Sequence, residues 1–244
     1  MPELPEVETI RRQLSKKIIG KKLNDKKIAG LRRRAKILII DFADGSSLVI
    51  HLKLTGQLIL NGEPSRYTRK VFNFNDGSRL LFNDAWKWGW WKKVKNTRQI
   101  ESQFGPEALE IDFLTFKDKL KQHPRVKIKP LLMDQKFIAG IGNIYSDEIL
   151  FAAKINPLRK AGMLSNEEVR QIHQNIKKIL KGAIQYRGTT VKDYLDVYGR
   201  QGGYGGHLKV YGKEGKKCSR CGTIIKRVKL AGRSVHFCPK CQPV

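Results

Sequence analysis

The sequence predicts an α+β protein, with an antiparallel sheet domain that carries one N-terminal helix, then a helical domain and a C-terminal hairpin with four cysteines. Three observations predict this class. Apolar residues form short strand-like runs between residues 22 and 94, beyond about residue 95 they recur with helical spacing, and all four cysteines lie between residues 218 and 241. We expect domain boundaries at 1–107, 108–209 and 210–244.

The first domain begins with an amphipathic helix over residues 5–19. Its apolar side chains fall on one stripe, and Gly20 follows as a stop signal. Two Asp-Gly turns then predict two hairpins, because strand-like residues flank each turn. The turns are 43–46, between strands at 37–42 and 47–52, and 75–78, between strands at 71–74 and 79–82.

Helical spacing predicts the second domain. One stripe comprises Phe113, Phe116 and Leu120, a second helix is expected over 144–153, and Ser165 with Glu168 forms a capping box before a long third helix. The stretch Gly199–Gly206 is too polar and too rich in glycine for a core element. It is either a loop that closes over a ligand or a plain surface loop.

The charge indicates the class of partner. The chain has 49 Lys and Arg against 22 Asp and Glu, a formal net charge of +27, and the cations are spread along its whole length. Such a balance favours a polyanion, with nucleic acid first and an anionic membrane surface second. No apolar run is long enough to span a membrane and no secretory signal is present, so we expect a cytoplasmic protein.

The cysteines form two Cys-x2-Cys pairs, which is the spacing of a four-cysteine zinc site. The alternative is two disulfides, which suit an exported chain. The ligand set is complete, so the zinc is expected to be structural, in a segment too small to fold on its own core. Several cations, Arg233 among them, lie between the two pairs. These cations either contact phosphates or form a solvated face. The ligands are Cys218, Cys221, Cys238 and Cys241.

The first eight residues carry the chemistry. Removal of Met1 would leave Pro2 as a free secondary amine, and an α-amino group titrates near pH 8. Such an amine attacks aldehyde-like carbons and forms a Schiff base, while Glu3 and Glu6 supply carboxylates within one helical turn for proton transfer. On composition alone the octet is also a simple helix start, with Pro5 at the first position and acids near the positive end of the dipole.

Two further motifs are open to two interpretations. The turn 140–145 precedes a helix, where backbone N–H groups bind phosphate and Asn143 is placed to cap and donate; glycine turns before helices are also common without such a role. All four tryptophans lie between residues 86 and 91 beside several lysines. They either stack on exposed bases or pack in the protein.

Several segments together resemble the formamidopyrimidine-DNA glycosylase and endonuclease VIII family, in the family's order and over essentially the whole chain. The resemblance implies an N-terminal β-sandwich, a helix–two-turns–helix domain and a zinc finger, with DNA bound between the lobes. The segments are the opening octet, Arg33-Arg34-Ala35-Lys36, residues 51–56, 140–145, 188–190 and 210–212, and the four-cysteine finger.

The resemblance also implies roles for single residues. Pro2 is the nucleophile on C1′ of the damaged nucleotide, Glu3 the proton-transfer group and Glu6 a supporting carboxylate. The expected DNA contacts are Lys36, Asn143 and Arg233 on phosphates, Leu54 as an apolar wedge, Trp88 as a ring that enters the duplex with Lys87 beside it, and Tyr204 in a lesion-capping loop.

The sequence departs from the family pattern at four places. Leu54 stands where methionine is common, and Trp86 replaces an arginine that would hydrogen-bond the base opposite the lesion. Residues 66–69 lack the family's histidines, and the segment between Gly20 and Arg33 is short for the family. The Trp86 replacement puts the opposite-base preference in question, whereas Trp88 keeps a ring that can enter the duplex.

We therefore expect a monomeric glycosylase and AP lyase that acts on double-stranded DNA containing oxidised bases or abasic sites. The Gly199–Gly206 loop favours oxidised purines, with strand cleavage by β- and δ-elimination and no redox cofactor or catalytic metal. Leu54 and Trp86 keep open an endonuclease VIII-like specificity for oxidised pyrimidines. A non-catalytic DNA-binding module is the third alternative, but binding alone does not require Pro2, Glu3 and Lys36.

Overall fold

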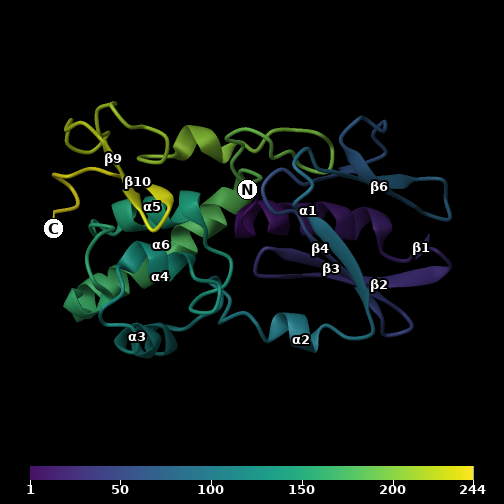
Figure 1. The fold of residues 1–244 in the computed structure, drawn as a ribbon, viewed down its shortest axis with the longest axis horizontal. Helices are drawn as coiled ribbons and strands as arrows, with labels where there is room; N and C mark the ends of the chain where they lie inside the picture. Colours follow the sequence, from purple (N-terminus) through teal and green to yellow (C-terminus); the bar gives the residue numbers. More distant parts are fainter. Residues whose placement is uncertain (244) are drawn as a thin grey trace. The chain divides into compact units, whose positions relative to one another are not determined.

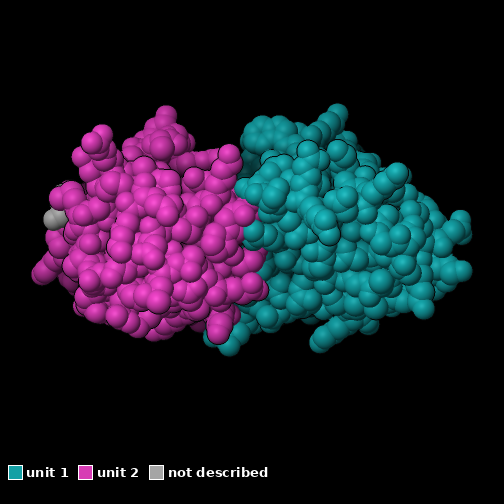
Figure 2. All heavy atoms as spheres, turned by 90° about the horizontal axis from the view of Figure 1, so that it is seen from below, with its two compact units in different colours: residues 1–103, 183–206 teal, residues 104–182, 207–244 magenta. Residues whose placement is uncertain are grey.

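The computed structural model describes residues 1–243, and these form two compact units (Figure 2). Unit 1 comprises residues 1–103 and 183–206, and unit 2 comprises residues 104–182 and 207 onward. Residues 183–206, expected in the second domain, therefore pack with the N-terminal segment. The predicted three-domain boundaries themselves stay a prediction.

Unit 1 contains two antiparallel sheets and the N-terminal helix (Figure 1). The strands of the larger sheet follow the order β1-β2-β3-β4-β8, and those of the smaller sheet the order β5-β7-β6. The elements are α1 (Leu4–Ile18), β1 (Lys22–Leu23), β2 (Lys26–Arg34), β3 (Ile37–Phe42), β4 (Ser47–His51), β5 (Gln57–Leu60), β6 (Thr68–Asn73), β7 (Arg79–Asn83), β8 (Trp90–Val94) and α2 (Arg98–Glu101).

A single apolar core joins α1 to both sheets. The predicted stripe of α1 is fully buried in it, as are alternate residues of the central strands; the stripe comprises Val7, Ile10, Leu14 and Ile18. Both predicted hairpins are confirmed, and each turn has a glycine with positive φ, at +81° for Gly45 and +80° for Gly77. The sequence pattern thus predicted this unit because hairpin turns and apolar periodicity are local signals.

Unit 2 combines helices with the cysteine-bearing hairpin. Its elements are α3 (Phe113–Lys121), α4 (Ile128–Met133), α5 (Asn143–Ala152), η1 (Ala161–Met163), most of α6 (Asn166–Gln185), β9 (Lys226–Leu230) and β10 (Arg233–Phe237). The predicted capping box before α6 is confirmed: the Ser165 N–H donates to Glu168 Oε2 at 2.8 Å, and the Glu168 N–H donates to Ser165 Oγ at 3.2 Å. Helix α4 was not expected, because six residues are too few for a periodic signal.

The glycine-rich stretch is more ordered than its composition predicts. It ends in the short helix η2 (Tyr204–His207), and Tyr204 is buried, which corrects the expectation that none of this stretch belongs to a core. Backbone bonds from Gly203 to Tyr186 O (2.7 Å) and from Tyr204 to Gly188 O (3.0 Å) hold it within unit 1.

A buried ion pair connects α4, α5 and β10 in unit 2. Lys129 Nζ donates to Asp147 Oδ1 at 2.6 Å and to the Ser234 carbonyl at 2.7 Å, and Asp147 Oδ2 accepts from the His236 N–H at 3.0 Å. Both side chains of the pair are almost completely shielded from water. Within residues 1–243, no helix is long and apolar enough to cross a membrane.

Removing one member of this pair should destabilise the protein strongly, because the other charge stays buried without compensation. We expect Lys129→Met to lower the free energy of unfolding by about 3–5 kcal/mol. The control is Lys121→Met, which breaks the exposed pair with Asp118 and should cost no more than about 1 kcal/mol. Denaturant unfolding of both variants measures the difference, and equal losses would contradict this account.

Candidate active site and zinc finger

The N-terminus enters unit 1 directly before α1. Met1 is 45% exposed, whereas Pro2 is buried and Glu3 is only 2% exposed. With Met1 present, the Pro2 nitrogen is an amide and cannot act as a nucleophile. Removal of Met1 would leave the secondary amine in an already buried position.

Glu6 is held at both of its carboxylate oxygens. Its Oε2 accepts from the Glu3 N–H at 2.8 Å, which closes the first turn of α1, and its Oε1 accepts from the Thr189 N–H at 2.7 Å. Gly188 lies directly beside it, because a Cβ there would come within 2.6 Å of Glu6 Oε1. The carboxylate therefore joins α1 to the segment that follows α6.

Lys36 is positioned by the turn between β2 and β3. Ala35 has a φ of +52°, and Lys36 follows it as a buried residue, 7% exposed. The turn is held from α1: Arg33 donates through Nε to Glu8 Oε2 at 3.3 Å and through a terminal nitrogen to the Ala35 carbonyl at 2.9 Å. Glu8 thus positions Lys36 in addition to its place near the start of α1.

The charged groups near the N-terminus act on the ionisation of its α-amino group. Burial lowers the pKa of the Met1 α-amino group, while the charges of Glu3, Glu6 and Asp193 act to raise it and that of Lys36 acts to lower it. A lowered pKa increases the neutral fraction of an amine at neutral pH. Near the same carboxylates, burial and the charge of Glu6 raise the pKa of Tyr194 well above its usual range.

Leu54 lies in the loop between β4 and β5 and is half-buried. The preceding Lys53 has a φ of +51°, and its N–H donates to His51 Nδ1 at 2.9 Å. Burial, followed by the charges of Lys53 and Lys36, lowers the pKa of His51 to about 4. The imidazole is therefore neutral at neutral pH and accepts the hydrogen bond that shapes this loop.

The tryptophan block divides into two parts. Trp91 packs edge-to-face on Phe82 inside unit 1, with ring centroids 5.2 Å apart, whereas Trp86 and Trp88 are 56% and 58% exposed in the loop before β8. Lys87 lies between the two exposed rings, exposed and with a φ of +60°. The packing interpretation is therefore correct for Trp91, and base contact by the exposed Trp86 and Trp88 stays a prediction.

In unit 2, Asn143 is the first residue of α5 and lies beside the hairpin. Its Nδ2 donates to Ser234 Oγ at 3.3 Å, and its Oδ1 is buried with no hydrogen-bond partner in the described part of the chain. The sequence led us to expect Asn143 as the cap of α5, but the N-cap is Gly142. Asn143 is already the first residue of the helix, one position too late for its side chain to serve as the N-cap. The neighbouring Arg233 is exposed at the start of β10.

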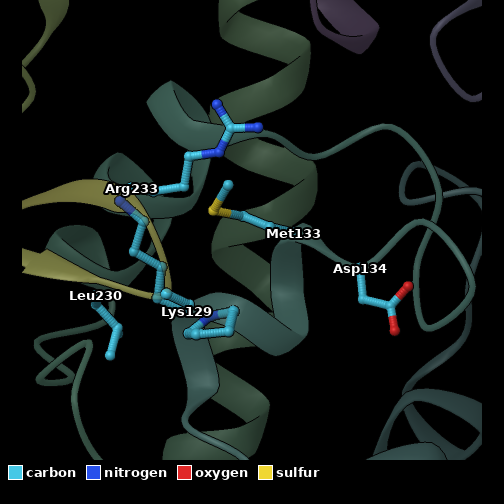
Figure 3. Close-up of a pocket in the computed structure, with 7 residues that line it drawn as sticks. Lys129, Met133, Asp134, Leu230 and Arg233 are labelled. Carbon is cyan, nitrogen blue, oxygen red and sulfur yellow. The ribbon is translucent and has the colours of Figure 1, made fainter.

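A cavity of about 210 Å³ lies beside Arg233, between α4 and the β9–β10 hairpin (Figure 3). In this view Met133 lies between the Arg233 guanidinium and the Asp134 carboxylate, while Leu230 comes from the hairpin. The cavity is smaller than the roughly 300–1,000 Å³ of small-molecule sites. It lies in unit 2 and contains none of the Pro2, Glu3, Glu6 or Lys36 side chains of unit 1.

The four cysteines converge at the base of the hairpin. Their sulfurs all lie within 4.8 Å of one another, with Cys218 Sγ 3.9 Å from Cys241 Sγ and Cys221 Sγ 3.4 Å from Cys238 Sγ. Sulfurs around a tetrahedral zinc at 2.3 Å are about 3.8 Å apart, so the donor set fits one structural Zn²⁺. No disulfide joins the four cysteines in the structure, which favours the zinc site over the two-disulfide alternative.

Comparison with known proteins decides the family. Residues 19–91 match the model of the formamidopyrimidine-DNA glycosylase N-terminal domain, residues 104–194 the H2TH domain of the same glycosylase, and residues 215–244 the zinc finger found in FPG and IleRS. The chain is 40% identical to the formamidopyrimidine-DNA glycosylase of Herpetosiphon aurantiacus, over 99% of this chain and all of that one. It belongs to the formamidopyrimidine-DNA glycosylase family.

Solved structures agree with this assignment. The Lactococcus lactis Fpg in complex with abasic-site DNA matches with a TM-score of 0.91 and 35% identity, over 99% of this chain and all of that one. The Thermus thermophilus MutM (FPG) protein matches with a TM-score of 0.92 and 36% identity, over 99% of this chain and 98% of that one. The α+β fold class and the zinc finger predicted from the sequence are thereby confirmed for this member of the family.

The structure groups four of the predicted residues, Pro2, Glu3, Glu6 and Lys36, in unit 1, and two others, Asn143 and Arg233, in unit 2. Several supporting residues were not expected from the sequence: Glu8 as a partner of Arg33, Gly188, Thr189 and Tyr194 around Glu6, and Asp193 as a charge that acts on the N-terminal amine. The only sequence signal for this group was the resemblance of 188–190 to a family segment.

Substitution of Gly188 tests the packing around Glu6. Gly188 has a φ of +79°, and an added Cβ would collide with the Glu6 carboxylate; Gly199 has a φ of +74° with nothing within 4 Å. Gly199→Ala should cost about 1–2 kcal/mol from the left-handed backbone alone. Gly188→Ala should cost more and should also reduce cleavage of lesion DNA. Similar losses of stability and full activity in both variants would show that Glu6 needs no such packing.

Removal of zinc should unfold the finger. We expect about one zinc per chain by elemental analysis, and Cys238→Ser or chelation should reduce DNA affinity, because metal binding and folding of such a segment are coupled. Ser219→Ala, between two ligands, serves as the control and should retain both zinc and affinity. Freshly purified protein that contains two disulfides and no zinc would contradict the site.

Proposed function

We propose that this chain is a base-excision repair DNA glycosylase with AP lyase activity that removes oxidised purines from double-stranded DNA. One observation carries the proposal: Pro2 is buried next to Glu3 and to a Glu6 held at both oxygens, and the charges of Glu3, Glu6 and Lys36 act on the α-amino group of Met1, in a member of this glycosylase family. Binding of DNA alone requires neither an unblocked amine nor buried carboxylates around it.

In the proposed reaction, the Pro2 amine attacks C1′ of the damaged nucleotide after Met1 has been removed. The bond from C1′ to the base breaks and the base leaves as it gains a proton. The C1′–O4′ bond then opens, O4′ gains a proton, and the sugar stays attached to Pro2 as an iminium ion. Loss of the C2′ proton then expels the 3′ phosphate, and a second elimination expels the 5′ phosphate. Glu3 moves protons at the sugar, and the iminium accepts the electron pair, so no redox cofactor is required.

The remaining predicted residues are proposed to hold the DNA. Lys36, Asn143 and Arg233 would bind phosphates, and the net charge of +27 suits such a polyanion. Leu54, Lys87 and Trp88 would occupy the space left by the extruded base, and Tyr204 would belong to the segment near the lesion. We further propose that the protein acts as a monomer on genomic DNA in the cytoplasm.

The relatives support the purine specificity by name and by their bound substrates. One solved Lactococcus lactis structure is a complex with DNA containing Fapy-dG, at 34% identity and a TM-score of 0.91. Leu54 and Trp86 favour the second candidate, an endonuclease VIII-like specificity for oxidised pyrimidines, because both differ from the family pattern where the DNA is expected to be distorted.

Borohydride trapping tests the nucleophile. We expect covalent trapping on a duplex with 8-oxoguanine, loss of trapping when a residue added before Pro2 blocks the amine, and recovery when a protease removes that residue. Glu3→Gln should bind the same DNA but excise the base at least about 100-fold more slowly, the usual loss for a missing proton-transfer group.

A matched set of duplexes with oxidised pyrimidines separates the two specificities. Preferred trapping of the purine lesions supports the proposal, and preferred trapping of pyrimidine lesions supports the second candidate. Undiminished trapping with a blocked N-terminus would exclude Pro2 as the nucleophile, and tight lesion binding without any trapping would leave a non-catalytic module.

A further inference from the structure

The cavity beside Arg233 is framed by bonds within unit 2. One wall is α4 and the other is the turn of the β9–β10 hairpin (Figure 3). The buried Lys129 ties the two walls together, because its Nζ donates to the Ser234 carbonyl at 2.7 Å and to Asp147 Oδ1 at 2.6 Å. The space between α4 and the hairpin is therefore a fixed feature of the fold and needs no ligand to form.

The hairpin turn places two unlike side chains at the edge of this cavity. Leu230 and Arg233 are directly opposite each other in the strand register, so their side chains project from the same face of the hairpin. Ala231 and Gly232, which lie between them, have φ values of +47° and +76°, as in a tight two-residue turn. Leu230 is half-buried, whereas Arg233 is exposed. An apolar group and a cation thus flank one opening.

The size and the lining of the cavity fit a ring-sized apolar group. Its volume is about 210 Å³, and an apolar cavity of roughly 150 Å³ is known to hold a benzene molecule. Apolar side chains supply most of the lining, and the apolar residues are Pro130, Met133, Leu230 and Ala231. Transfer of a ring from water to such a lining is favourable. A drug-sized ligand would not fit, but a single ring would.

The charges around the opening favour an anion. In the described part of the chain, the Arg233 side chain has no hydrogen-bond or ion-pair partner. Asp134, the one acid of the lining, points its carboxylate away from Met133 and Arg233 in Figure 3, and its Oδ1 accepts from the Lys136 N–H at 2.9 Å. Glu214 is the only acidic residue between positions 207 and 244. A guanidinium in this setting pairs best with a carboxylate, which it binds through two parallel hydrogen bonds.

We propose that this cavity binds a small organic acid, with a ring-sized apolar part between α4 and the hairpin and a carboxylate on Arg233. Binding of the acid is independent of catalysis. A second part of the inference rests on the proposed function, which assigns Arg233 to a DNA phosphate. A carboxylate and a phosphate repel each other at one guanidinium, so the acid would compete with DNA and couple DNA affinity to its own concentration.

Methionine methyl groups report on the cavity directly. The chain has three methionines, of which Met133 lines the cavity and Met163 is 66% exposed on η1, outside the lining. We expect phenylacetate to shift the Met133 methyl signal in NMR spectra of the whole zinc-loaded protein, with a Kd of roughly millimolar order for so small a ligand. The Met163 signal should stay in place.

Two further probes separate the ring from the charge. Phenylacetamide keeps the ring without the charge, and acetate keeps the charge without the ring. Each should bind at least about 10-fold more weakly than phenylacetate, the usual loss when a hydrogen bond to a charged group or a buried ring is missing. Equal affinities for the three probes, equal shifts at Met133 and Met163, or no saturable shift at Met133 would overturn the site.

Substitutions test the role of Arg233. Arg233→Gln should weaken phenylacetate at least about 10-fold and leave phenylacetamide unchanged. The control is Lys229→Gln, which removes the same charge from an exposed residue of β9 that does not line the cavity and should change neither probe. Leu230→Trp should fill the space and exclude both probes. Circular dichroism verifies folding of each variant, and an Arg233→Gln protein with unchanged phenylacetate affinity would contradict the assignment.

Competition with DNA is measured by fluorescence anisotropy of a labelled, undamaged duplex. Phenylacetate should weaken DNA binding severalfold compared with acetate at the same concentration, which controls for ionic strength. If phenylacetate occupies the cavity and DNA affinity does not change, the competition is wrong. If lesion DNA is trapped by borohydride but no probe moves Met133, the cavity site is wrong and the proposed function stands. If the acid binds but no lesion is trapped in any DNA, the proposed function fails and the cavity site stands.

Discussion

The bond between Glu6 and the Thr189 backbone is the interaction on which the candidate active site depends. It joins α1 to a segment 183 residues further along the chain, while the other oxygen of Glu6 closes the first turn of α1 on Glu3. A carboxylate buried in this way must have both oxygens satisfied, since a buried charge without partners is costly. The same two bonds therefore stabilise the fold and orient the residues around Pro2.

Other buried acids have the same structural use. Asp84 organises the loop of exposed tryptophans, Asp147 receives Lys129 and the hairpin, and Glu148 accepts from the backbone N–H groups of residues 209–211. Burial raises the pKa of Glu148, although these three bonds act against that shift. In a chain with 22 acids and 49 bases, acids used inside each unit leave an excess of cations for DNA phosphates.

Local signals in the sequence predicted most of the fold. The α1 stripe, both hairpins, the Ser165 capping box and the cysteine pairs each depend on residues within about twenty positions of one another. Periodicity, turn residues and ligand spacing act over such distances. Helix α4 and the burial of Tyr204 were missed, because a six-residue helix has no periodicity and packing partners of a glycine-rich loop lie elsewhere in the chain.

The sequence by itself determined the chemistry available to this protein: a proline that can become a free amine, carboxylates beside it, four zinc-binding thiols and a large positive charge. Only the tertiary structure decided which groups meet. Two of these contacts are bonds from backbone N–H groups, that of Thr189 to Glu6 and that of Gly89 to Asp84. A third contact joins the side chains of Glu8 and Arg33, which lie on different elements. Such contacts have no residue pattern, because the backbone amide is common to every residue except proline and its position follows from the packing of the whole unit.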